Sequence, residues 1–284
     1  MSVNLDIRPS PIAGQWYPGD PKRLAMTVDR YIEDARLPEL EGELVAIITP
    51  HAGHMYSGPV AGYAFAALKG LKPDIVAVIS PMHYPYHEPL LTTAHEAYET
   101  PLGIIKVDKE AVQKLDECLQ NELGYGLTRI RRDQEHSLEI ELPFIQQAIG
   151  TEVKLLPVMV RDQSRRVTRS LGECLAKTLR GRNTVLVAST DLSHFYPQAI
   201  ANQLDDEMLR CIESFDPDEV IRAEEEGRGF ACGRGALAAV LWAAKDLGAN
   251  TVKILKHATS GDVTGDTSQV VGYGAAVVLR QKSG

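Results

Sequence analysis

The sequence predicts a single α/β domain over residues 1–284, with a central, mostly parallel or mixed sheet flanked by helices. Short apolar runs alternate along the chain with amphipathic segments, as expected when helices cover a sheet. Three apolar runs, at residues 44–49, 75–79 and 184–189, are followed by polar loops, and such runs are typical of buried strands. No repeat, low-complexity tract or linker rich in Gly, Pro or Ser divides the chain.

The first half of the chain should alternate helices and strands. Asp20 followed by Pro21 is a favourable helix start, because Asp caps free N–H groups and proline at the first helical position loses no hydrogen bond. Pro50 and Pro81 end the two buried strands of this half. We expect, in order, a helix from residue 21 with Leu24, Val28, Tyr31 and Ile32 on one face, a strand at 44–49, a small-residue helix at 59–68, a strand at 75–79, a short strand ending at Val107, and a helix capped by Asp108 that carries Val112, Leu115 and Leu119.

The second half continues the pattern and closes with two strands. Apolar residues recur at helical spacing after residue 137 and again after Ser164, which is a suitable N-cap. We expect a helix at 137–149, a strand at 153–160, a helix from 165, a strand at 184–189, helices near 199–215, 216–226 and 234–247, and strands at 251–256 and 272–279.

Composition excludes several classes of protein. The chain has 30 Lys and Arg against 38 Asp and Glu, a net charge of −8, which argues against a general binder of nucleic acids or anionic membranes. No apolar run approaches the roughly 20 residues that a membrane span needs. No signal peptide is visible, so we expect a cytoplasmic protein with reduced thiols. Three of its four cysteines, Cys118, Cys174 and Cys211, should pack in helices as small hydrophobic residues.

Histidines gather in the loops that follow the three buried strands. These loops hold five of the eight histidines, and one of them also holds Asp191. In open α/β sheets, ligands bind at the carboxyl ends of the strands, so we expect His51, His83, Asp191 and His194 to face one cleft. Any single histidine could equally be an ordinary turn residue. Together they favour a metal site or a proton-transfer site, because imidazole serves both. We assign His95 and His257 to the structure alone.

Cys232 differs from the other cysteines because it lies between glycines in a turn that precedes a predicted helix. A helix N-terminus stabilises a thiolate, and a thiolate with two imidazoles is a competent ligand set for Fe(II), Zn(II) or copper. A buried structural thiol is the alternative.

The stretch from Glu135 to Glu141 opens another predicted helix. Its acidic residues would favour the helix dipole, which is the simpler interpretation. Alternatively, His136 or Glu139 orients a metal-binding histidine or contacts substrate without itself binding the metal. No P-loop and no nucleophile elbow of the G-x-S-x-G type occurs, which disfavours nucleotide hydrolysis through a P-loop and the α/β-hydrolase class.

At these residues the sequence resembles the Memo family, whose prokaryotic members are often called AmmeMemoRadiSam system protein B. The motifs that carry the resemblance occur in the family's order along nearly the whole chain. They are Ala-Gly-Gln-Trp-Tyr-Pro at 13–18, Pro-His-Ala-Gly at 50–53 with Tyr-Ser-Gly at 56–58, Ser-Pro-Met-His at 80–83, Glu-His-Ser-Leu-Glu at 135–139 with Leu-Pro-Phe at 142–144, Ser-Thr-Asp-Leu-Ser-His at 189–194, and Cys-Gly-Arg at 232–234.

The resemblance implies a LigB-like fold, similar to the class III extradiol dioxygenases, which are non-heme iron enzymes. It implies a metal pocket made by His51, His83 and Cys232, with Asp191 and His194 beside it as catalytic residues. Cys232 stands where the dioxygenases have a carboxylate ligand, and a thiolate shifts preference toward zinc or copper. Ring cleavage therefore does not transfer with the resemblance, although Fe(II) remains the metal we expect.

The remaining candidate residues would surround the metal or contact substrate. His54 departs from the family, whose members commonly have an aromatic residue such as Tyr there, and it could alter the polarity of the pocket mouth or add a ligand. The N–H groups that open the helix after Cys232, with Arg234, could hold an anion. The other members of this set are Trp16, Tyr56, His136 and Glu139.

Three functions follow, in order of preference. The first is a metal-dependent, dioxygenase-like redox enzyme in which His194 moves protons and Asp191 sets its tautomer or binds a metal-bound water. The second is a binding module that uses the same cleft for a phosphopeptide or a protein, with the radical-SAM and AMMECR1-like proteins encoded near family members as expected partners. The third is a zinc hydrolase.

Overall fold

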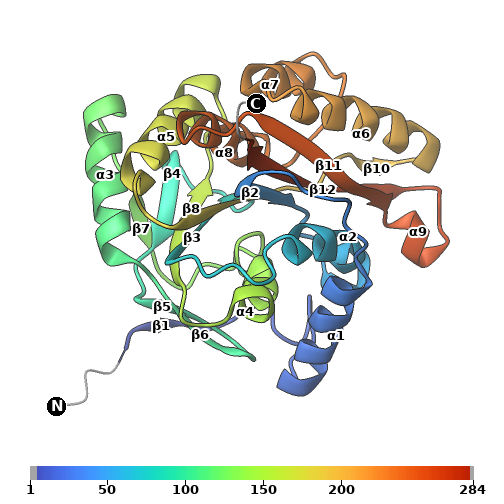
Figure 1. Cartoon of the computed structure of the whole chain (residues 1–284), viewed down its shortest axis with the longest axis horizontal. Helices are drawn as coiled ribbons and strands as arrows, with labels where there is room; N and C mark the ends of the chain where they lie inside the picture. The colour runs from blue at the N-terminus through green and yellow to red at the C-terminus, as the bar shows by residue number, and fades with distance from the viewer. Residues whose placement is uncertain (1–4, 282–284) are drawn as a thin grey trace.

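A mixed β-sheet forms the centre of the structure, a computed structural model that describes residues 5–281 (Figure 1). Its strands are β2 (Glu43–Thr49), β3 (Ile75–Pro81), β4 (Leu90–Thr93), β7 (Thr128–Ile130), β8 (Lys154–Val160), β9 (Thr184–Ser189), β10 (His194–Tyr196), β11 (Thr251–Thr259) and β12 (Val270–Arg280). They lie in the order β10-β12-β2-β9-β3-β8-β4-β7, and β11 pairs with β12. The predicted fold class, one α/β domain with a mixed sheet and flanking helices, is confirmed.

The four central strands β2, β9, β3 and β8 are parallel, and this arrangement sets the position of the candidate site. Their side chains are almost all buried, as expected for apolar strands covered on both faces. The neighbours β12 and β4 run antiparallel to β2 and β8. Because the central strands share one direction, the loops after β2, β3 and β9 emerge at one edge of the sheet.

Helices cover both faces of the sheet (Figure 1). α3, α5 and α8 pack on one face, α1, α2 and α4 on the other, and α6 packs on β11 and β12 beside α7. The helices are α1 (Pro21–Asp34), α2 (His54–Ala66), α3 (Lys109–Leu123), α4 (Leu142–Ile149), α5 (Arg165–Leu179), α6 (Gln198–Glu213), α7 (Pro217–Glu225), α8 (Arg234–Asp246) and α9 (Gly261–Thr264), with a 3-10 helix η1 (Glu139–Glu141) before α4. Within residues 5–281, no helix combines the length and apolarity that crossing a membrane requires.

A small separate sheet holds the beginning of the described chain. It contains β1 (Ile7–Arg8), β5 (Ala97–Thr100) and β6 (Gly103–Lys106), with β1 parallel to β5. The N-terminal segment therefore lies beside residues 90 positions later in the sequence.

Two predicted helices differ from the structure. The helix expected at 59–68 begins earlier, at His54, and Pro59 lies inside it. The missing N–H of that proline affects only a carbonyl in the exposed first turn of the helix. The helix expected at 137–149 is divided into η1 and α4. The short strands β1, β4, β7 and β10 carry too few residues to show a period in the sequence.

One pair of cysteines contradicts the expectation of reduced thiols. Cys118 of α3 and Cys174 of α5 form a disulfide, with their Cα atoms 5.7 Å apart and a sequence separation of 56 positions. The spacing of the two residues does not indicate the pairing, because it depends on how α3 packs against α5. Cys211 is free and buried, as expected, and Cys232 is free.

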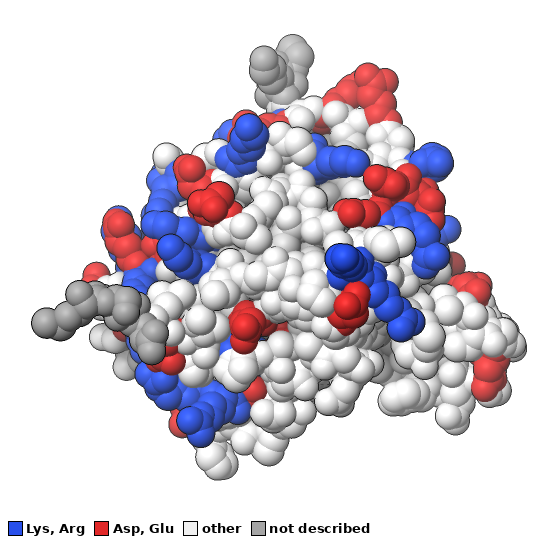
Figure 2. Space-filling view, turned by 90° about the horizontal axis from the view of Figure 1, so that it is seen from below, with Lys and Arg blue, Asp and Glu red and all other residues white. Residues whose placement is uncertain are grey.

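The charged residues on the face shown in Figure 2 are mixed in sign. Lys and Arg side chains alternate with Asp and Glu side chains there, so the described residues of this face present no continuous basic surface. This distribution agrees with the net charge of −8.

Candidate functional site

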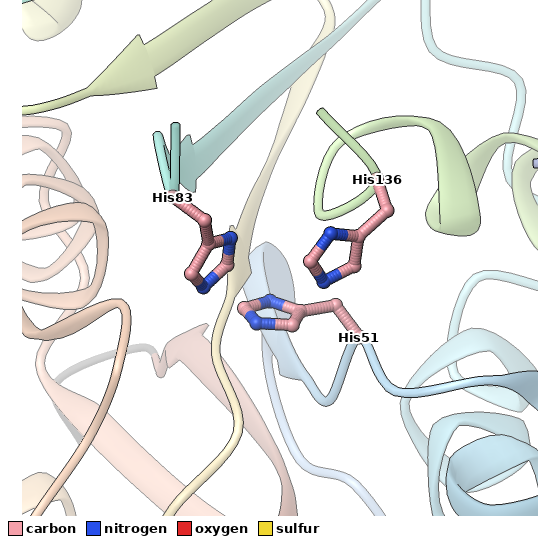
Figure 3. Close-up of side chains that lie close together, drawn as sticks. All are labelled: His51, His83 and His136. Carbon is pink, nitrogen blue, oxygen red and sulfur yellow. The ribbon is translucent and has the colours of Figure 1, made fainter. Parts of the chain in front are cut away.

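Three histidines from three separate loops converge at the carboxyl edge of the sheet (Figure 3). His51 follows β2, His83 follows β3, and His136 precedes η1. One ring nitrogen from each lies within 4.8 Å of the others, and the ring centroids of His51 and His83 are 5.3 Å apart. His51 is buried, whereas His83 is exposed, so the cluster opens to solvent on the His83 side.

A buried hydrogen-bonded chain sets the tautomer of His51. Its Nδ1 lies 2.9 Å from Oγ of Ser189, which lies 2.7 Å from the carbonyl of Ser137 and from Oε1 of Glu141. Ser189 Oγ donates toward the oxygens of Ser137 and Glu141, so it accepts the hydrogen bond from the Nδ1–H of His51. Burial raises the pKa of the Glu141 carboxyl well above its ordinary value, and the hydrogen bond from Ser189 opposes that rise.

His51 consequently presents Nε2 to the cleft as an unprotonated acceptor. Burial, together with the neighbouring imidazoles, lowers the pKa of His51 well below 6.5, so this ring is neutral near pH 7. A neutral imidazole with one nitrogen already donating is the form that binds a metal.

Glu135 fixes His83 through two contacts. Its carboxylate accepts the backbone N–H of His83 at 2.6 Å and Nδ1 of the same residue at 2.9 Å, which leaves Nε2 of His83 free. The backbone N–H groups of His136 and Ser137 also bind it, each at 3.0 Å. Burial alone would raise the pKa of Glu135, but the hydrogen bonds from His83 and Ser137 lower it to about 2. Glu135 is therefore a buried anion beside the three rings.

His136 stacks between two other rings. Its centroid lies 4.0 Å from that of Trp16 and 4.8 Å from that of His83. Burial lowers the pKa of His136 to about 4, so it is neutral near pH 7. The sequence suggested an orienting or substrate-contacting role for this residue, whereas the structure groups its ring nitrogen with those of His51 and His83 as a possible metal ligand.

Cys232 approaches the cluster from the turn before α8. Its Sγ lies 3.1 Å from Nε2 of His51 and accepts the backbone N–H of Asp191 at 3.3 Å. Burial and the Asp191 carboxyl raise the pKa of the Cys232 thiol above its ordinary value, so it is a thiol that can donate to the His51 lone pair. Gly233 permits this approach, because a Cβ there would lie 2.4 Å from the carbonyl oxygen of Ser189.

Asp191 and His194 follow β9, and their side chains do not bond to each other. Asp191 is buried, and its Oδ1 accepts the backbone N–H of His51 at 2.7 Å. Burial raises the pKa of Asp191 to about 7. Nδ1 of His194 lies 2.8 Å from the carbonyl of Leu192, so that carbonyl sets the tautomer. The expectation that Asp191 sets it is wrong, because the Asp191 carboxyl faces the backbone of the His51 loop.

His54 and Glu139 lie away from the cleft. His54 is the first residue of α2 and is buried, with Nε2 3.0 Å from the carbonyl of Ile140 and its ring against Phe144. It therefore does not reach the pocket mouth, because the helix begins early enough to turn the ring into the core. Glu139 accepts hydrogen bonds from residues of the N-terminal segment and from no histidine in the described chain; its partners are Arg8, Ser10 and Tyr17.

The turn after Cys232 does not present an anion site. Arg234 is paired with Glu224 at 3.0 Å, and the N–H of Gly235 donates to Oε1 of Gln163 at 2.7 Å. The expected anion-binding groups thus already have partners within the chain.

A groove of about 560 Å³ adjoins the histidine cluster. Trp16 and Tyr56 line it with Phe195 and Tyr273, and Ala52 and Gly53, which follow His51, form part of its wall. No charged side chain of the described residues lines it. Phe195 has a φ of 63°, an unusual conformation for a residue other than glycine, and its side chain is 69% exposed.

Three residues that hold the histidines were not predicted from the sequence. In the sequence, Glu135 and Glu141 indicate only a helix dipole, and Ser189 only the end of a strand. The adjacency of Glu135 to His136 was the available signal, but its role depends on the contact with His83, 52 residues away.

The sequence matches the family described as Memo-like protein over residues 8–277. A MEMO1 family protein of Nitrosopumilus maritimus is 35% identical over 274 residues, which cover 95% of this chain and 98% of that protein. A MEMO1 family protein of Thermotoga neapolitana is 36% identical over 284 residues, covering 96% and 99%.

A solved structure shares the fold at low sequence identity. It is that of an uncharacterized protein, JW3007, from Escherichia coli K12. The TM-score is 0.53 and the identity 17%, with 83% of this chain and 100% of that chain covered. At this identity the likeness concerns the fold alone.

Proposed function

Because this chain belongs to the Memo family, we propose that it is a metal-dependent redox enzyme of the dioxygenase-like type, with one metal ion at the carboxyl edge of the sheet. The observation that carries the proposal is the convergence of three imidazoles at that edge, with the Cys232 thiol 3.1 Å from Nε2 of His51. His51 and His83 would each supply Nε2, and the third protein ligand would be His136 or Cys232.

The charges around these donors favour a cation. Glu135 is a buried anion whose carboxylate contacts no Lys or Arg side chain within residues 5–281. It binds Nδ1 of His83, and a carboxylate behind a ligand histidine raises the basicity of that ligand. The Ser189 hydroxyl holds Nδ1 of His51 in the same way, so both rings are in the tautomer that leaves Nε2 available to a metal.

Fe(II) suits this set, and Zn(II) or copper are the alternatives. Imidazoles bind all three ions, and a thiolate ligand from Cys232 would shift preference toward zinc or copper. The cleft is open beside His83, which leaves room for further ligands, and a bound iron would supply coordination positions for O₂ or substrate.

His194 and Asp191 would handle protons in this enzyme. Burial lowers the pKa of His194, and Nδ1 is held by the Leu192 carbonyl, so Nε2 is a free base near neutral pH. Burial raises the pKa of Asp191 to about 7, so its carboxyl would exchange a proton near neutral pH. The adjoining groove, lined by Trp16 and Tyr56, would hold the substrate.

Anaerobic metal loading tests the proposal. Protein loaded separately with Fe(II), Zn(II) and Cu(I) should bind one equivalent, and His51→Ala should lose it. Comparing His136→Ala with Cys232→Ser identifies the third ligand, since only that substitution should also lower the affinity by at least about tenfold. His95→Ala, a histidine outside the site, is the control. Full stoichiometry and unchanged affinity in His51→Ala would contradict the proposal.

A binding module is the second candidate function, and the groove would suit an uncharged ligand better than a charged one. Its walls carry no charged side chain among the described residues, and Arg234 is paired with Glu224. A phosphopeptide lacks a cationic partner there. Calorimetry of the metal-free protein with phosphorylated and unphosphorylated forms of one peptide tests this, because tight binding of only the phosphorylated form would overturn the preference.

A zinc hydrolase would use the same donors. Hydrolysis of an activated ester by the zinc-loaded protein, absent from the iron-loaded protein and from His51→Ala, would support that function.

A further inference from the structure

The N-terminal segment, residues 5–17, lies against the loop that carries Glu135 and His136. We infer that Arg8 of this segment is a positioning residue that fixes the loop of residues 133–139, and thereby holds Glu135 and His136 at the candidate site. The inference rests on the proposed function for its consequence in metal binding, but the positioning itself is measurable without metal.

Arg8 is buried and binds the loop at several points. Its guanidinium binds the Asp133 carboxylate through Nε at 3.0 Å and Nη2 at 2.8 Å, and Nη1 binds the Glu139 carboxylate. Nη2 also reaches the backbone carbonyl oxygens of Asp133 at 3.3 Å and Glu135 at 3.0 Å. The side chain is 1% exposed. One cation thus holds both ends of the loop and the backbone of the residue that orients His83.

The loop depends on such contacts because it lacks regular structure. Residues 133–136 belong to no helix or strand, and Arg132, just before them, has a φ of 52°. Without a backbone ladder, the conformation of the loop is set by side-chain bonds to its carboxylates and carbonyls. Arg8 supplies these bonds from a strand, β1, that is itself paired with β5.

Other residues of the same segment hold the loop from a second side. The hydroxyl of Tyr17 donates to Oε1 of Glu139 at 2.7 Å, and the Trp16 ring stacks on His136. The carbonyl of Trp16 also accepts the N–H of His54 at 2.9 Å, which ties the segment to α2. Movement of the loop would therefore separate the rings of Trp16 and His136.

A purely stabilising ion pair is the competing explanation, and the chain offers a matched control for it. Arg182 pairs with the buried carboxylate of Asp108 at 2.9 Å, beside the start of α3, at the opposite edge of the sheet from the histidines. Its loss should lower stability without affecting the candidate site.

The experiment uses the full chain with Trp242→Phe as background, so that Trp16 is the single tryptophan of the two in the sequence. Arg8→Met, Arg8→Lys and Arg182→Met are compared by circular dichroism, by acrylamide quenching of Trp16 without metal, and by titration with Co(II) as the metal probe. Arg8→Lys keeps the charge but lacks the fork that binds two carboxylates.

We expect Arg8→Met to retain its secondary structure, to increase quenching of Trp16, and to weaken Co(II) binding by about 10- to 100-fold. Arg8→Lys should change both readouts in the same direction by less, and it decides the question if Arg8→Met does not fold. Arg182→Met should change neither. Unchanged quenching in both folded Arg8 variants, or equal changes in Arg182→Met, would overturn the inference. Failure of the parent to bind Co(II) would contradict the proposed function, and Trp16 quenching would still test the positioning.

Discussion

Buried His54 should make the stability of this protein depend on pH between 4 and 6.5. Nε2 of His54 donates to the carbonyl of Ile140, while Nδ1 is buried without a hydrogen-bond partner. Protonation would place a charge on a ring that no described carboxylate contacts. Burial accordingly lowers the pKa of His54 to about 4.

The size and the sign of the effect follow from the two pKa values. An unfolded histidine titrates near 6.5 and the folded one near 4, so the unfolded chain binds the proton more tightly and stability falls as the pH is lowered. Each pH unit between those values is worth about 1.4 kcal/mol, which gives a loss of roughly 3 kcal/mol at pH 4. At pH 5 the loss is about 2 kcal/mol, and above pH 7 it is negligible.

The assay is urea unfolding of the wild type and His54→Gln at pH 8, 7, 6 and 5. Gln cannot titrate but can still donate to the Ile140 carbonyl. The other buried titrating groups are present in both proteins, so the difference between the two curves isolates His54. Between pH 8 and pH 5, the wild type should lose about 2 kcal/mol more than the variant. The same substitution at exposed His87 is the control. Parallel curves for the wild type and His54→Gln would refute the reasoning.

The remaining predictions concern the disulfide and the residues behind the site. Cys174→Ala removes the disulfide to Cys118, and the loss of a closed loop of this length should lower the free energy of unfolding by about 4 kcal/mol. Denaturant unfolding measures this loss, and the wild type with reductant must show the same loss. Glu135→Gln removes the anion that holds His83 and should weaken metal binding by about 10- to 100-fold by calorimetry, whereas unchanged affinity would exclude a role for the charge. Gly233→Ala forces a Cβ against the β9 carbonyl and should cost about 1–3 kcal/mol in unfolding free energy, a prediction that fails if the denaturation midpoint is unchanged.

The sequence determined the class of fold and the edge of the sheet where the site lies. The three buried strands at 44–49, 75–79 and 184–189 are visible as apolar runs, because a strand covered on both faces has no polar alternation. Their parallel direction places the loops after them together, so the grouping of His51 and His83 follows from a general rule on α/β sheets.

Only the tertiary structure decided which residues contact these histidines. The bond of Glu135 to His83, the Ser189 hydroxyl behind His51 and the pairing of Cys118 with Cys174 join residues more than 50 positions apart. The position of His54 was likewise decided by the tertiary structure. The helix begins at His54, five residues before the proline that suggested its start, and this turns the ring into the core. Local patterns specify periodicity and chain direction, whereas hydrogen-bond partners and side-chain pairs depend on how distant segments pack, which no local pattern encodes.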